Sequence, residues 1–165
     1  MNTTQKLTRC ALLSALALML SYIEALIPFF AGMPGVKLGL ANIVVLFCLY
    51  TLGGKYGFYV NLVRICLAGL LFGSPFSTLY ALSGGLLSLG VMLMLKKTGK
   101  FSIVGVSMAG GFFHNLGQIL VAAAVVQTPQ VFYYFPVLIF VGIGTGILNG
   151  VIALLVLSRL DKRQV

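Results

Sequence analysis

The chain has 165 residues, of which 60% are hydrophobic and only 8% are charged, and its mean hydropathy is +1.10. Soluble domains carry roughly 25% charged residues, so this composition cannot coat a water-facing surface and excludes an ordinary soluble domain. The net charge of +9 comes from 11 Lys and Arg residues against two acids, and it does not indicate a nucleic-acid surface, because the basic residues gather at the ends of apolar runs.

Six apolar runs follow one another along the chain. They predict helices over residues 8–27, 38–52, 58–72, 77–95, 103–126 and 132–160. A helix that spans a bilayer needs about 20 mainly apolar residues, so six helices with short loops use nearly the whole chain. We therefore expect one transmembrane domain over residues 1–165, an all-α polytopic membrane bundle of about six helices.

The segments between the runs carry the turn residues Pro and Gly and most of the charges. Basic residues flank the ends that we place in the cytoplasm: Lys6, Arg9, Lys55, Lys96, Lys97, Lys100, Arg159, Lys162 and Arg163. This pattern predicts cytoplasmic N- and C-termini and a multi-pass membrane protein. Lys37, in the first predicted outer loop, is the one basic residue that departs from the pattern.

Small residues recur at helical spacing in the first and last runs. Ala11 and Ala15 form an AxxxA pair, and Gly142, Gly146 and Gly150 repeat every four residues, so each set shares one helix face. Such faces let helices approach closely in lipid. For the glycines we expect packing within the chain, with a partner as the alternative. For the alanines, docking to a partner protein is a serious competitor to internal packing.

Ionisable residues inside a membrane are costly, so their positions are informative about function. Four such residues stand out: Glu24 near the outer end of the first helix, Lys37 before the second, Arg64 in the third and His114 in the fifth. Each also has an ordinary explanation. Glu24 and Arg64 could neutralise each other, His114 could be a hydrogen-bonded core residue, and Lys37 could extend to the lipid headgroups.

Amide side chains accompany these residues at spacings that share a helix face. Asn61 lies three residues before Arg64, and Gln118 follows His114 by four and Asn115 by three. Asn42 lies near the outer end of the second helix, whereas Asn149 is expected towards the inner side of the last helix. The pattern predicts a polar cavity that opens to the outside and binds a small molecule through Glu24, Lys37, Asn42, Asn61, Arg64, His114, Asn115 and Gln118.

Several motifs of catalysis are missing from the sequence. It has no GxxxxGK[ST] phosphate loop, no acidic cluster to hold Mg²⁺ and a diphosphate, and no Ser or Cys nucleophile with a credible His and acid partner. Cys10, Cys48 and Cys66 are isolated in apolar stretches, without metal or redox spacing. We expect no catalytic residues, no metal and no cofactor, and hence no enzyme.

Three segments resemble a known family: the stretch from Pro34 to Asn42 (PGVKLGLAN), Asn61-Leu62-Val63-Arg64 with the following 69–73, and His114-Asn115-Leu116-Gly117-Gln118. They resemble the Gx transporter family, also labelled heptaprenyl diphosphate synthase component I, which is similar to the substrate-binding S components of energy-coupling factor (ECF) vitamin transporters. That similarity implies six helices, an outward-facing pocket, docking through Ala11 and Ala15, and partners that supply a coupling membrane protein and ATPase subunits.

The synthase label implies prenyl diphosphate chemistry, which needs aspartate-rich Mg²⁺ motifs. The chain has one aspartate, Asp161, so catalysis by this chain is not expected, and an accessory role remains. We therefore expect a substrate-binding subunit that captures a vitamin, a flavin, or an isoprenoid or quinone precursor from outside the cell. The alternatives are a non-catalytic scaffold for a redox or prenyl-lipid system and a small channel or exchanger that acts alone.

Overall fold

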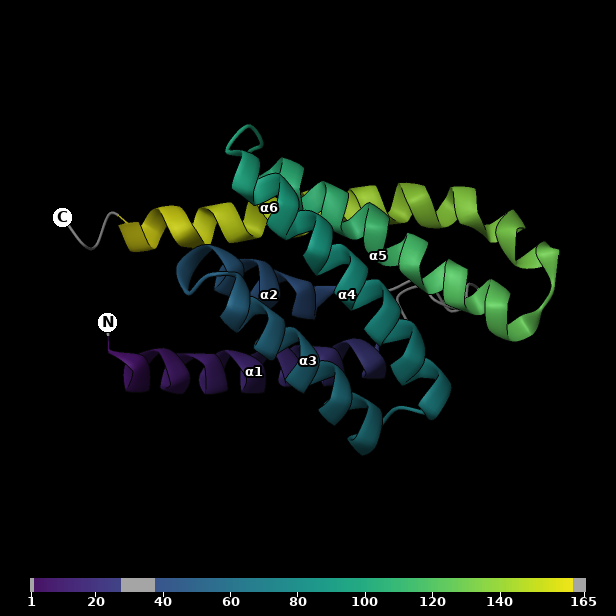
Figure 1. Cartoon of the computed structure of the whole chain (residues 1–165), viewed down its shortest axis with the longest axis horizontal. Coiled ribbons are helices and arrows are strands. Elements are labelled where there is room, and N and C mark those ends of the chain that lie inside the picture. Colours follow the sequence, from purple (N-terminus) through teal and green to yellow (C-terminus); the bar gives the residue numbers. More distant parts are fainter. Residues whose placement is uncertain (1, 28–37, 162–165) are drawn as a thin grey trace.

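The computed structural model describes residues 2–27 and 38–161 of the chain as a bundle of helices (Figure 1). No strand occurs within these residues, and the predicted all-α bundle of six helices is confirmed. The helices are α1 (Thr3–Leu26), α2 (Leu40–Thr51), α3 (Gly54–Leu71), α4 (Pro75–Thr98), α5 (Ile103–Val126) and α6 (Phe135–Asp161), and a 3₁₀ helix, η1 (Pro129–Tyr134), precedes α6.

The observed helix bounds differ from the predicted ones mainly at two places. Helix α1 begins at Thr3 rather than at residue 8, since the polar residues before the apolar run continue the helix. The glycine-rich segment 53–57 was expected to be a turn, but only Gly53 leaves the helical conformation, with φ 96°, and α3 starts at Gly54. One glycine in a conformation that other residues avoid is enough to reverse the chain.

The capping residues of α4 and α5 explain why these two helices begin where they do. Ser74 accepts a hydrogen bond from the backbone N–H of Ser77, and Pro75 follows at the first helical position. Ser102 accepts from the N–H of Gly105 in the same way. Serine caps of this kind satisfy N–H groups that have no partner within the helix, and proline at the first position has no N–H to satisfy.

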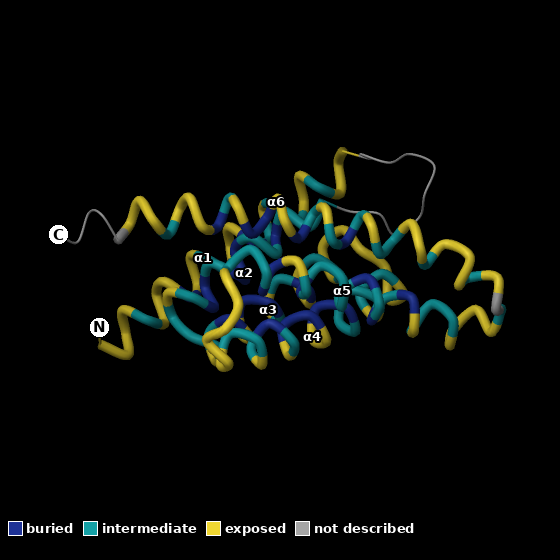
Figure 2. Tube along the Cα trace, turned by 90° about the horizontal axis from the view of Figure 1, so that it is seen from above, coloured by how far each residue is buried: buried dark blue, intermediate teal, exposed yellow. Residues whose placement is uncertain are grey.

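Four helical segments of the described chain are long and apolar enough to cross a membrane: α1, α4, α5 and the continuous stretch Gln130–Leu160. Their outward surfaces are apolar, as the 76% exposure of Phe140 and the 70% exposure of Met94 illustrate. Figure 2 shows exposed residues around the outside of the bundle and buried residues along its middle. The chain is therefore a membrane protein, and large exposed apolar surfaces of this kind face lipid or a partner.

The helices form two groups that meet where α2 packs on α6 and where α3 packs on α4. Helix α5 packs between α4 and α6, while α1 packs against α2 and α3, and α2 also contacts α6. Helix α1 begins and α6 ends at the same end of the bundle (Figure 1). Despite its 12 residues, α2 is the most buried helix, with a core of Ala41, Val44, Val45, Leu46, Cys48 and Leu49.

Glycines bring α5 and α6 into backbone contact. A Cβ added at Gly146 would lie 2.7 Å from the carbonyl oxygen of Ser107, and one added at Gly150 would lie 2.8 Å from the Cα of Val104. Gly142 faces Gly111 in the same manner. The predicted glycine stripe therefore packs within the chain, and we call the contact of Gly111, Gly142, Gly146 and Gly150 the α5–α6 seam.

Candidate functional site

The site is built around the start of α2, which lies inside the bundle. At about 1.5 Å per residue, the 12 residues of α2 cover about 18 Å, whereas the apolar core of a bilayer is about 30 Å thick. Gly39, with φ 70°, begins the helix, and its N–H donates a hydrogen bond to the carboxylate of Glu24 on α1. Because α2 is short, it leaves space in the bundle next to its N-terminal end.

Asn149 of α6 holds the same end of α2 from the other side. Its Nδ2 donates to the carbonyl oxygens of Gly39 at 3.1 Å and Leu38 at 3.3 Å. Asn149 was not among the predicted binding residues, but the structure brings it to the start of α2. The reason is that α2 begins in the middle of the bundle rather than at its edge, so that a residue halfway along α6 reaches it.

An open cavity of about 600 Å³ lies beyond this end of α2, and we call it the main cavity. Helices α1, α2, α3, α4 and α5 and the residues before α2 supply its walls. Its polar lining consists of Ser21, Glu24, Asn42, Arg64, Ser74, Ser77, Thr78, His114 and Gln118, and Ile65, Ala68 and Phe72 are among its apolar residues. A concave, mainly apolar site with a few converging polar groups is typical of small-molecule binding.

Arg64 is held in the main cavity by two amide side chains. Its Nη2 donates to Asn42 Oδ1 at 2.8 Å and to Asn61 Oδ1 at 2.9 Å, and its Nε donates to Asn61 Oδ1 at 3.2 Å. Asn61 is 1% exposed and donates in turn to the carbonyl oxygen of Gly85 on α4. We call Arg64, Asn42 and Asn61 the Arg64 cluster; it fixes one cation at the junction of α2, α3 and α4.

The guanidinium of Arg64 keeps part of its binding capacity. An arginine side chain has five N–H donors, and the three hydrogen bonds to the amides use Nε and Nη2. Its other terminal nitrogen, Nη1, makes no hydrogen bond to any residue that the structure describes. Glu24 lines the same cavity, so a ligand group at Arg64 would meet both a cation and a carboxylate.

The predicted binding residues divide into three sets. Glu24, Asn42, Arg64, His114 and Gln118 line the main cavity together. Asn61 lies behind Arg64 as its support, and Asn115 faces away from the cavity wall towards α6, where its Nδ2 donates to the carbonyl oxygen of Leu138. Lys37 lies outside the described residues.

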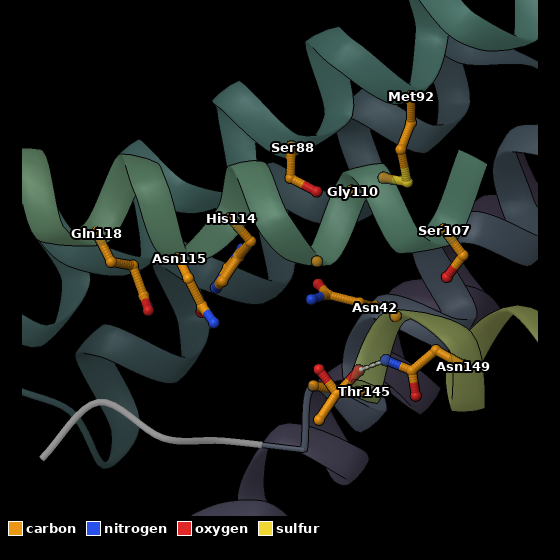
Figure 3. A pocket seen from close by; sticks show the side chains of 13 residues that line it. Asn42, Ser88, Met92, Ser107, Gly110, His114, Asn115, Gln118, Thr145 and Asn149 are labelled. Carbon is orange, nitrogen blue, oxygen red and sulfur yellow. Dashed lines mark hydrogen bonds between the residues drawn. The ribbon is translucent and has the colours of Figure 1, made fainter. Parts of the chain in front are cut away.

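A second, smaller pocket of about 30 Å³ adjoins the main cavity, and we call it the small pocket (Figure 3). The two spaces share Gly39, Asn42, His114 and Gln118 as lining residues. Figure 3 shows Asn42 between side chains of α5 and side chains of α6. The remaining polar residues of the small pocket are Ser88, Ser107, Asn115, Thr145 and Asn149.

Sequence reasoning missed Ser88, Ser107 and Thr145. Isolated serines and threonines in apolar helices usually bond to their own backbone, so they carry little signal by themselves. A signal was nevertheless present, because each lies within three residues of a glycine that packs against another helix: Gly85, Gly110 and Gly146. Close backbone approach of α4, α5 and α6 brings these short hydroxyl side chains to one point.

The two alanines that were expected to dock a partner lie on the outer surface of α1. Both Ala11 and Ala15 are exposed, and so are their neighbours Leu12 and Leu16. The face is therefore apolar, carries small side chains at Ala11 and Ala15, and is covered by no other described helix.

Comparison with known proteins gives one match. A family model described as heptaprenyl diphosphate synthase component I matches residues 13–156, which is most of the chain. No curated protein and no solved structure gives a match.

Proposed function

The chain belongs to the heptaprenyl diphosphate synthase component I family, and we propose that it is a membrane-embedded substrate-binding subunit of a small-molecule uptake transporter, similar to an ECF S component. In this proposal it captures a vitamin, a flavin, or an isoprenoid or quinone precursor from the extracellular side of a bacterial inner membrane. It is not an enzyme, and energy comes from an ATPase through a coupling membrane protein.

The observation that carries the proposal is the position of Arg64 in the main cavity. A charged side chain inside a membrane bundle is costly and is retained where it lines a substrate pathway or pairs with another group. The cavity volume of about 600 Å³ falls within the range of about 300 to 1,000 Å³ that small-molecule sites occupy. Arg64 Nη1 can donate to a carbonyl, carboxylate or phosphate oxygen of a ligand, and Glu24 and Gln118 can orient the remainder.

The proposed partner surface is the face of α1 that carries Ala11 and Ala15. Small residues on an exposed helix allow close approach by a second membrane helix. Because this face is distant in sequence from Arg64, binding of a ligand and docking of a partner are separable by substitution.

The proposal is tested by titrating the purified protein in detergent with a panel of vitamins, flavins, isoprenoid diphosphates and quinone precursors. Arg64→Met is expected to weaken the binding of any compound that binds the wild type by tenfold or more, since removing one member of a desolvated polar contact costs about 2 kcal/mol or more. Lys55→Met is the matched control, because Lys55 is an exposed cation at the other end of α3. Equal affinity of Arg64→Met and wild type for such a compound would disprove the assignment.

A second candidate function follows from the family description. We propose as the alternative that the chain is a non-catalytic accessory subunit of a prenyl diphosphate or quinone biosynthetic system. In that case it would copurify with a catalytic synthase chain, and Arg64→Met would leave this association intact. Uptake that depends on ATPase subunits would favour the transporter, and transport by the chain alone in liposomes would indicate a channel or exchanger.

A further inference from the structure

The small pocket contains polar groups that the protein itself does not satisfy. The hydroxyls of Ser88 and Ser107 make no hydrogen bond to any described residue, although the two side chains are only 4% and 6% exposed. In Figure 3 the Ser88 hydroxyl points from α4 towards Gly110, and the Ser107 hydroxyl points from α5 towards the side where Asn42 and Asn149 lie. Both serines line the small pocket, so their hydroxyls are available to a molecule that enters it.

Asn149 adds an unpaired acceptor to the same pocket. Its side chain is 5% exposed, and its Oδ1 has no hydrogen-bond partner among the described residues. The orientation of the amide is fixed, since only its NH₂ group can donate to the carbonyl oxygens of Leu38 and Gly39. Oδ1 therefore remains available to a donor.

The charges around the small pocket decide what kind of group fits. Among its described lining residues there is no Asp, Glu, Lys or Arg, and His114 is the one titratable side chain. A buried ion without a counter-ion is very costly, so the pocket disfavours both cations and anions. The positive end of α2 at Gly39 further opposes a cation, and the Asn149 Oδ1 lone pairs oppose an anion. An apolar group would leave the hydroxyls and Oδ1 unpaired.

We propose that the small pocket is a subsite for a neutral hydrogen-bonding group of the ligand, such as an amide or the N–H and C=O edge of a heterocycle. This inference rests on the proposed function, because it assigns the subsite to the ligand of the main cavity. About 30 Å³ is room for roughly two water-sized groups, which matches the two polar atoms of an amide. Asn42 and His114 line both spaces, so the subsite adjoins the main cavity.

The subsite narrows the class of substrate. A ligand would place an N–H or O–H donor in the small pocket and a carbonyl or anionic oxygen near Arg64 Nη1. Compounds that offer only acceptors, such as a simple quinone, would leave Asn149 Oδ1 unpaired. Compounds whose only polar group is a diphosphate would have to bury an ion there. Vitamins and flavins with neutral amide or imide groups are thus favoured over those two classes.

The test uses three probes of the same shape and different charge: acetamide, acetate and acetamidinium. Saturation-transfer NMR on the methyl group of each probe, with the purified chain in detergent, reports binding in the millimolar range expected for so few atoms. The double variant Ser88→Ala/Ser107→Ala removes the hydroxyls, and Ser158→Ala is the control at an exposed site on α6. Because neither hydroxyl bonds to described protein groups, the double variant is expected to keep the thermal stability of the wild type.

We expect saturable binding of acetamide that falls at least fivefold in the double variant and is unchanged in Ser158→Ala. Signals from acetate and acetamidinium should be the same in the double variant and the wild type. Thr145→Val, an isosteric change at another wall of the pocket, provides a second variant and should also weaken acetamide binding.

Three results would overturn the subsite. The first is that acetamide shows no saturable binding. The second is that wild type and double variant bind acetamide equally well. The third is that the serine substitutions remove the signal of acetate or acetamidinium rather than that of acetamide. These outcomes differ from failure of the proposed function, which is decided by the effect of Arg64→Met on the compound panel. If binding of a ligand depends on Arg64 but not on Ser88 or Ser107, the subsite proposal is wrong and the proposed function stands.

Discussion

The α5–α6 seam and the Arg64 cluster both lie in the interior of the bundle, but they are built in opposite ways. At the seam, glycines let backbone meet backbone, as at Gly142 and Gly146. The Arg64 cluster fills its place with one guanidinium and two amides joined by hydrogen bonds. Close packing in lipid stabilises the first, whereas the second removes a charge from water and returns little stability.

This difference separates the part of the chain that maintains the fold from the part that can bind a ligand. A buried ionic or polar cluster can often be replaced by apolar residues without loss of stability, so its presence is explained by function more readily than by folding. Removing an amide while the cation stays is costly for another reason, because a buried charge is then short of partners. The comparison therefore predicts different results for different substitutions, which follow from the largest expected effect to the smallest.

Gly146→Ala is expected to have the largest effect on stability. The added Cβ would lie 2.7 Å from the carbonyl oxygen of Ser107 and 2.8 Å from the Cα of Met108, so the helices themselves must move apart. Overpacking against backbone should lower the free energy of unfolding by about 3 kcal/mol or more, measured by thermal or chemical unfolding in detergent. Gly144→Ala on the same helix meets no atom within 4 Å and should change little. Equal stability of the two variants would show that the seam does not hold the fold.

Asn61→Leu should rank second. The substitution removes both the acceptor for Arg64 and the donor to the Gly85 carbonyl oxygen, and the loss is expected to be about 2 to 4 kcal/mol in the same unfolding assay. If the cost arises from leaving Arg64 short of partners, the double variant Asn61→Leu/Arg64→Met should be more stable than Asn61→Leu alone. Simple additivity of the two substitutions would contradict the coupling.

Arg64→Met alone should change the unfolding free energy by less than about 1 kcal/mol, and it could raise it, because an apolar side chain replaces a charge that is costly to bury. The same variant is the one expected to lose ligand binding. If Arg64→Met keeps its stability but loses ligand binding, it contrasts clearly with Gly146→Ala, which is expected to lose stability. A large destabilisation by Arg64→Met would instead make the cluster part of the fold and weaken the functional assignment.

Sequence reasoning located most of the polar residues of the main cavity but missed Asn149 and the hydroxyl residues of the small pocket. Glu24, Arg64 and His114 were found because an ionisable residue in an apolar run is conspicuous, and the i, i+3 and i, i+4 spacings placed Asn61 and Gln118 near them. Helix number and order followed from apolar runs separated by Pro, Gly and basic residues. These features are local, so the sequence shows them directly.

The other features of the site depend on how deep in the bundle each helix begins and on how closely neighbouring helices approach each other. The depth at which α2 begins is set by contacts of Gly39 with Glu24 and Asn149, which are 15 and 110 residues away along the chain. No local pattern fixes such distances, so the sequence did not place Asn149 beside the start of α2. Ser88 and Ser107 likewise come together because α4 packs closely against α5. Glycines allow this close packing, but their presence in the sequence does not show which helices will approach each other.

The small residues of α1 supply the prediction with the smallest effect on stability. Ala11 and Ala15 form a pattern like that of α6, but the structure leaves them exposed, so their substitution should not disturb the fold. Ala11→Leu/Ala15→Leu is expected to change the unfolding free energy by no more than about 0.5 kcal/mol. If α1 docks a coupling membrane protein, the same variant should lose copurification with that partner and ligand uptake, while binding by the isolated chain is kept. Ala124→Leu, at an exposed alanine of α5, should keep all three properties. Unchanged copurification of the α1 variant would show that the small residues of α1 have no role beyond contact with lipid. Small-residue faces would then matter in this chain only where another of its own helices covers them, as at the α5–α6 seam.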